Sequence, residues 1–112
     1  MTWIMRRGEV WWVDFDPARG GEIRKIRPAV IVSNDLSNTH LNRLLVVPLT
    51  SNTGRLYPSE AVVNVGGQSS KAMADQLTAV AKERLTSRLG VLSRADLKAV
   101  DHVVMIQLNL PL

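Results

Sequence analysis

The stretch from Arg27 to Asp35, with the sequence RPAVIVSND, constrains the fold more than any other part of the chain. Pro28 fixes its own φ and biases the residue before it away from helix, so Arg27 is predicted to be extended on a loop. The β-branched run at 30–32 is typical of a short buried strand, and the polar residues 33–35 end it. Because a strand that starts at a proline is a rigid base, we expect a guanidinium held in place for a phosphate.

The charge balance favours a polyanionic partner. Lysine and arginine number 14 against 10 aspartates and glutamates, for a net charge of +4 and a sequence pI near 10.1. The chain has no cysteine, which excludes disulfides and thiolate metal sites, and His40 and His102 are too far apart to form a ligand pair. We therefore expect no metal and no other cofactor.

Length and hydropathy predict one domain over residues 1–112, because 112 residues suffice for a single modest core. The hydrophobic fraction of 46% argues against disorder. No apolar run approaches membrane length, and the apolar start is too short for a signal peptide, so a cytoplasmic protein with no membrane association is expected. Residues 1–5 are a candidate ragged leader, since Met5 could itself begin the chain.

Apolar runs predict five or six short strands, at Gly8–Phe15, Ala29–Ser33, Leu44–Leu49, Glu60–Val65, Lys71–Val80 and Arg88–Leu92. In the first, Trp11, Val13 and Phe15 should share one face, which leaves Trp12 half-buried or on a contact surface on the other. Pro48 cannot donate a ladder bond, so its strand should lie on an edge or contain a bulge.

Loops and turns separate these strands. Residues 16–26 contain Pro17, Gly20 and Gly21 without periodicity and predict a long loop, of the kind that is often functional or mobile. The polar connector through Asn42 is compatible with a short helical turn. A loop rich in hydroxyl and amide groups spans 50–54 and ends near Tyr57-Pro58, and residues 66–70 predict a turn.

The C-terminal segment predicts a helix. Ser93 and Asp96 resemble a capping box, and an apolar stripe follows at helical spacing, with Leu97, Val100, Val104 and Leu108. His102 falls off this stripe and should be a solvated surface residue. Short strands with one C-terminal helix predict a small, mainly antiparallel β-barrel-like domain.

The candidate site residues each have an ordinary structural explanation. Arg27 alone would be a surface arginine, and Thr50 a strand-end hydroxyl bonded to nearby backbone. Their loops, 16–26 and 50–58, should however converge at one rim of a small barrel. The cationic run Arg24-Lys25-Arg27 is either a solvated loop or a track for a phosphate backbone.

Two polar residues of the predicted strand 71–80, Gln76 and Asp75, also have ordinary structural explanations. Gln76 is either an unremarkable surface amide or a donor to a base edge of single-stranded RNA. Asp75 shares a predicted face with Met73 and Leu77, and we expect a partly buried, hydrogen-bonded carboxylate with a structural role.

From about Arg7 to Leu110 the chain resembles the MazF/PemK (Kid) toxins of bacterial toxin–antitoxin pairs. The resemblance rests on motifs in register, namely Gly8-Glu9-Val10-Trp11, Val13-Asp14-Phe15-Asp16-Pro17, Gly20-x-Glu22, Arg27-Pro28-Ala29-Val30, Val47-Pro48-Leu49-Thr50-Ser51, Tyr57-Pro58 and Ala74-Asp75-Gln76. Each motif alone is weak evidence for the family, but all of them in the same order are a specific match.

This resemblance implies an SH3-like barrel of the Kid/MazF/CcdB type that forms homodimers. It implies a sequence-specific, metal-independent endoribonuclease that cleaves single-stranded RNA and is silenced by a cognate antitoxin. The ribose 2′-OH would attack the adjacent phosphorus, giving a 2′,3′-cyclic phosphate and a 5′-OH. By resemblance Arg27 and Thr50 take the catalytic positions. The expected RNA-binding residues are Gly21, Glu22, Arg24, Lys25, Ser51, Asn52 and Gln76.

The chain departs from the family at Gly21, where a serine is usual, and the lost hydroxyl bears on RNA binding and on the cut sequence. Two other functions stay open. The same barrel supports CcdB-like toxins that poison gyrase and cleave nothing, because fold alone does not fix function. A plain nucleic-acid-binding barrel, such as a repressor partner, would have no need of Thr50.

Overall fold

The computed structural model describes residues 4–15 and 25–112. Its strands are β1 (Glu9–Asp14), β2 (Ile26–Ile31), β3 (Arg43–Thr50), β4 (Glu60–Val65), β5 (Gln68–Met73), β6 (Thr78–Ala81) and β7 (Leu85–Val91). Its helices are α1 (Asp35–His40) and α2 (Arg94–Gln107), with 3₁₀ turns η1 (Ala74–Gln76) and η2 (Lys82–Arg84). No helix in these residues is long and apolar enough to cross a membrane.

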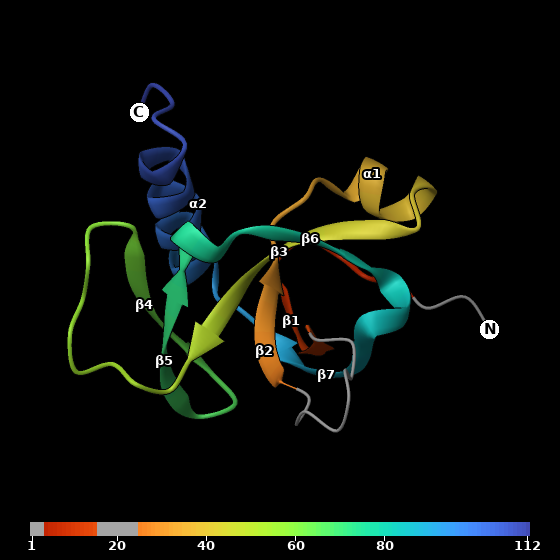
Figure 1. Cartoon of the computed structure of the whole chain (residues 1–112), viewed down its shortest axis with the longest axis horizontal. Helices are drawn as coiled ribbons and strands as arrows, with labels where there is room; N and C mark the ends of the chain where they lie inside the picture. The colour runs from red at the N-terminus through yellow and green to blue at the C-terminus, as the bar shows by residue number, and fades with distance from the viewer. Residues whose placement is uncertain (1–3, 16–24) are drawn as a thin grey trace, which may run out of the picture.

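The strands form a seven-stranded antiparallel sheet in the order β4-β5-β3-β2-β1-β7, with β6 paired to β3 (Figure 1). The sheet curls until its outer strands approach, and a Cβ on Gly90 of β7 would lie 3.0 Å from Val65 Cγ2 of β4. The result is a half-barrel with α2 against β4. The predicted mainly-β barrel with a C-terminal helix is confirmed, and the described residues form seven strands where five or six were predicted.

The central strands β1, β2 and β3 are buried on both faces, which explains their nearly continuous apolar sequence. Trp11, Ala29 and Val46 pack into one core, together with Met5 and Leu85. The residues next to these in each strand point to the other face of the sheet. Among them, Val10, Val30 and Val47 pack into a second core beneath α2. The predicted alternation of β1 is therefore confirmed, and Trp12 is half-buried as expected.

Both prolines of the central strands lie inside the sheet. Pro28 belongs to β2, so the prediction that Arg27 lies on a loop is wrong: both residues pair with β1. The prediction of an edge strand or a bulge at Pro48 is also wrong, since β3 is paired on both sides and its register with β2 includes Pro48 without a shift. On one side, β3 pairs with β6 at residues 43–46 and with β5 at residues 49–50. Pro48 lies between these segments, where its missing N–H removes no ladder bond to either strand.

The predicted strand 71–80 is interrupted by η1, which is the main correction to the sequence analysis. β5 ends at Met73 beside β4, and β6 begins at Thr78 beside the other half of β3, so the chain must turn between them. The Ala74 N–H donates to Ser59 O at 3.0 Å and holds this turn. Asp75 is exposed on the turn, so its predicted partial burial is wrong.

The C-terminal helix begins at the predicted cap. Ser93 Oγ accepts from the Asp96 N–H at 3.1 Å at the start of α2, and Asp96 Oδ2 accepts from the Asn64 N–H at 2.9 Å, which ties the helix to β4. His102 is exposed, as predicted. The predicted turn before Asn42 is α1, where the Arg7 N–H bound to Asp35 lowers the pKa of that carboxyl.

Candidate functional site

A cavity of about 340 Å³ opens where β2 begins and β3 ends. Its lining residues come from β1, β2, β3, the β4–β5 hairpin and β7: Trp12, Arg27, Pro28, Leu49, Thr50, Ser51, Val65, Gly66, Gln68, Ser70 and Leu89. Ala29 pairs with Pro48, and the same register continued by two residues sets Arg27 opposite Thr50. The structure therefore brings Arg27 and Thr50 to one rim, as the sequence predicts.

The Arg27 side chain is half-buried and open to a ligand. Within residues 4–15 and 25–112, no carboxylate or carbonyl group accepts a hydrogen bond from its guanidinium. Arg27 also lines a neighbouring cavity of about 260 Å³, together with Lys25 and Gln76. Its guanidinium thus lies between two cavities, with a second cation close by, where a bound phosphate would meet fork-shaped donors.

The Thr50 hydroxyl is arranged to donate. Its Oγ1 accepts the Asn52 N–H at 3.3 Å, so its own hydrogen stays available for an acceptor in the cavity. Ser51 lines the same cavity with a second hydroxyl. Asn52 is exposed and outside the lining, and its Oδ1 accepts the Gly54 N–H at 3.3 Å. Three polar groups, from Arg27, Thr50 and Ser51, therefore face one space.

The other predicted residues divide between the second cavity and the undescribed segment. Lys25 precedes β2 and Gln76 ends η1, so each reaches the second cavity from a different side. The Gln76 amide also donates to Met73 Sδ at 3.6 Å. Gly21, Glu22 and Arg24 lie outside the residues that the structure describes.

Part of the lining of the larger cavity, contributed by β1, β5 and β7, was not predicted from the sequence. Gln68 and Ser70 were expected in a turn, and the structure places them on β5, where they line the cavity with Arg27. Trp12 and Leu89 supply apolar surface, because β7 pairs with β1 and the sheet curls. Pairing between strands far apart in the sequence builds this part of the lining, and no local pattern signals it.

A cavity lined by a cation, by hydroxyl and amide groups and by apolar side chains suits a phosphodiester that carries a base. The fold and this cavity together define a small half-barrel protein with a cleft lined by an arginine and hydroxyl groups. The chain belongs to the PemK-like, MazF-like toxin family of type II toxin–antitoxin systems, whose family model matches residues 6–108.

The chain is also similar to known proteins over nearly its whole length. It is 43% identical to the endoribonuclease MazF9 of Mycobacterium tuberculosis, over 96% of this chain and 98% of that protein. A mycobacterial endoribonuclease solved in complex with its cognate antitoxin has a TM-score of 0.81 at 25% identity, covering 96% and 98% of the two chains. A MazE–MazF structure from Deinococcus radiodurans has a TM-score of 0.85 at 22% identity, covering 98% and 100%, and shows the shared fold.

Proposed function

We propose that this protein is a sequence-specific endoribonuclease toxin that cleaves single-stranded RNA in the cytoplasm and is silenced by a cognate antitoxin. The observation that carries the proposal is the joint lining of one cavity by Arg27 and Thr50. The 43% identity to an endoribonuclease over 96% of this chain supports the same activity.

The chemistry is the one that the family resemblance implies, and it needs no metal. The ribose 2′-OH attacks the adjacent phosphorus, the bond to the 5′-oxygen of the next nucleotide breaks, and the products are a 2′,3′-cyclic phosphate and a 5′-OH. Negative charge gathers on the non-bridging oxygens in the transition state, where the Arg27 guanidinium and the Thr50 hydroxyl donate to them. Arginine stays protonated at any accessible pH, so Arg27 acts as a phosphate clamp rather than as a base.

RNA would cross both cavities with its backbone over Arg27. Lys25 adds charge along the backbone, and Ser51 and Gln76 offer donors and acceptors to phosphate or base edges. We assign Gly21, Glu22, Arg24 and Asn52 to RNA binding on the resemblance alone. An antitoxin would occupy the same groove with a disordered acidic segment and exclude RNA.

The proposal predicts discrete cuts in a long single-stranded RNA incubated with purified protein in EDTA. Primer extension maps the cuts, and labelling by polynucleotide kinase without prior phosphatase treatment detects the new 5′-OH ends. A folded, antitoxin-free sample that leaves RNA intact would contradict the proposal. Arrest of gyrase by that same sample would favour the CcdB-like alternative.

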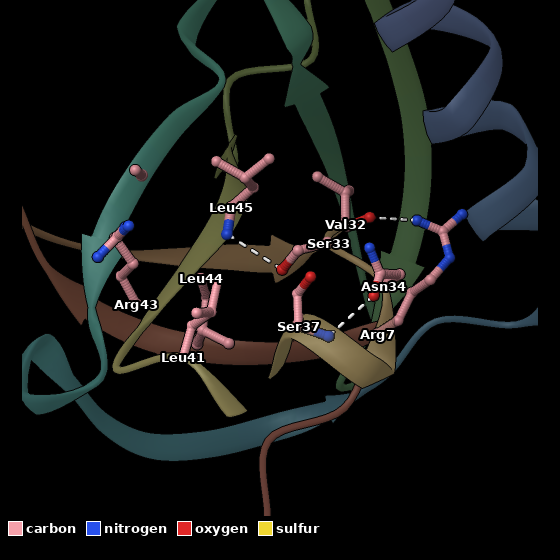
Figure 2. Close-up of a pocket in the computed structure, with 10 residues that line it drawn as sticks. Arg7, Val32, Ser33, Asn34, Ser37, Leu41, Arg43, Leu44 and Leu45 are labelled. Atoms are coloured by element: carbon pink, nitrogen blue, oxygen red, sulfur yellow. Dashed lines mark hydrogen bonds between the residues drawn. The ribbon is translucent and has the colours of Figure 1, made fainter. Parts of the chain in front are cut away.

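We also propose a homodimer, formed through an apolar groove between α1 and the sheet. The groove encloses about 550 Å³, and Figure 2 shows its leucines beside the hydrogen bond from the Leu45 N–H to Ser33 Oγ. Leu41 and Leu45 line it and keep 45% and 44% of their surface exposed, while Leu36 on α1 is 74% exposed. A cluster of exposed aliphatic side chains of this kind is typical of a surface that binds another protein chain.

Light scattering at micromolar concentration should give the mass of a dimer, and Leu45→Glu should give the mass of a monomer with an intact fold. Val62→Glu is the matched control, because Val62 has the same 44% exposure on β4 and lies outside the groove. A monomeric wild-type protein, or a Leu45→Glu variant that stays dimeric, would contradict this assignment of the dimer surface.

A further inference from the structure

We propose that Lys71 is a positioning residue that fixes the loop between β3 and β4 beside the cleavage site. The inference rests on the proposed ribonuclease function and assigns the control of RNA binding to a residue that itself lines neither cavity. The loop, residues 51–59, follows Thr50 directly and contains Ser51 and Asn52.

The loop has little packing of its own to hold it. Residues 51–58 are all exposed. Two hydrogen bonds, from the Asn52 N–H to Thr50 Oγ1 and from the Gly54 N–H to Asn52 Oδ1, order only its first turn. Exposed connections with so few contacts usually sample many conformations, so a defined position requires an anchor elsewhere.

Lys71 supplies this anchor from β5. Its side chain is only 9% exposed, and its Nζ donates to the backbone oxygen of Arg55 at 2.8 Å. The same Nζ lies 3.1 Å from Glu60 Oε1, and that oxygen accepts the Tyr57 N–H at 2.8 Å. One buried ammonium therefore fixes the middle of the loop directly and its end through Glu60.

Lys71 is also connected to the catalytic strand. It is the ladder partner of Thr50 on β3 and of Val62 on β4. Its Nζ lies 5.7 Å from the centre of the Tyr57 ring, and the Arg55 guanidinium lies 5.0 Å from the same ring. Lys71 thus links the strand that presents Thr50 to the middle of the loop that presents Ser51, while backbone hydrogen bonds to Tyr57 O and Ser59 O hold the end of the loop.

Stability alone does not account for a lysine at this position. A buried ion pair is often no more stabilising than well-packed apolar residues of similar volume, whereas removing one partner leaves an uncompensated charge. An apolar pair would fill the space between β4 and β5 equally well, but it could not bind the Arg55 carbonyl. The ammonium is needed for the loop rather than for the sheet.

The test compares wild type with Lys71→Met and with the double variant Lys71→Met/Glu60→Gln. The single variant leaves the Glu60 carboxylate buried without its cation, so its Tm should fall. The double variant removes both charges and keeps an oxygen that can accept from Tyr57, so its Tm should recover. Residue 71 cannot donate to the Arg55 oxygen in either variant, so the loop should stay released in both.

Release of the loop can be measured without RNA, by the rate at which trypsin cleaves it. Trypsin cuts after the exposed Arg55, and the cut between residues 55 and 56 is identified by mass spectrometry. We expect the rate of this cut to rise about tenfold or more in both variants, since a hydrogen bond from a charged donor is lost. Lys82→Met is the matched control, because Lys82 Nζ donates to the Asn38 oxygen far from this loop.

Kinetics on RNA complete the test. In the double variant the KM for RNA should rise about tenfold to hundredfold with a smaller change in kcat, and Lys71→Arg should restore part of the loss. A double variant with wild-type trypsin sensitivity would overturn the inference, as would one with wild-type KM on an active enzyme. If the wild-type protein cleaves no RNA, the proposed function fails, while the trypsin experiment still decides the role of Lys71.

Discussion

Replacing Arg27 with alanine should lower the rate of RNA cleavage at least about 10²- to 10³-fold, the loss expected for one preorganised donor to a transition-state oxygen. The fold should be unchanged. Arg27 is half-buried at the start of β2, and within the described ranges 4–15 and 25–112 it satisfies no buried carboxylate or carbonyl. Single-turnover cleavage in EDTA and the thermal unfolding curve measure the two effects separately.

Lysine at the same position separates charge from geometry. Arg27→Lys keeps the cation but loses the planar fork that binds two phosphate oxygens together, so only part of the rate should return. Arg94→Ala is the matched control, because it removes one positive charge from the exposed start of α2 and leaves the cavity intact. Cleavage by Arg27→Ala at the wild-type rate would remove Arg27 from the catalytic site.

The parts of the fold that were predictable are those encoded by local periodicity. β4 has the predicted bounds, Glu60–Val65, and α2 follows the predicted cap at Ser93. The alternation of β1 assigns its side chains to the correct faces, since each face of β1 meets a different apolar core. In each case, neighbouring residues carry enough information to specify the element.

Features that depend on strand pairing could not be predicted in this way. Nothing local in residues 71–80 shows that β5 must leave β4 at Met73 and that β6 must join a different part of β3. The exposure of Asp75 follows from that turn. The burial of Lys71 is equally non-local, because its partner Glu60 lies on another strand.

The candidate site also has a part that was predictable from the sequence and a part that depends on strand pairing. Arg27 and Thr50 each had an ordinary structural explanation when taken alone, and the expected convergence of their loops at one rim singled them out. The resemblance to a toxin family then assigned them a common role. The part of the lining with Gln68, Ser70 and Leu89 arises only when the sheet curls and brings β5 and β7 toward β2.

Thr50→Val should give the second large loss of activity, about 10²-fold in kcat, because valine keeps the shape of the side chain and removes its only donor. Thr50→Ser, which restores a hydroxyl at the same position, should return most of the rate. KM should change little in Thr50→Val if the hydroxyl acts mainly on the transition state. Quenched-flow cleavage of a short RNA that contains the mapped cut site measures both constants.

The hydroxyl of Thr50 also has a structural contact, and the experiment must separate the two roles. Valine removes the acceptor for the Asn52 N–H, so part of any loss could come from the loop. Trypsin sensitivity at Arg55 reports on the loop independently, and it should stay near the wild-type value if Lys71 still holds the Arg55 carbonyl. Thr39→Val on α1 is the matched control, because its hydroxyl donates within the helix, to the Asp35 oxygen. A Thr50→Val enzyme with wild-type kcat would exclude the hydroxyl from the chemistry and favour a nucleic-acid-binding barrel that has no need of it.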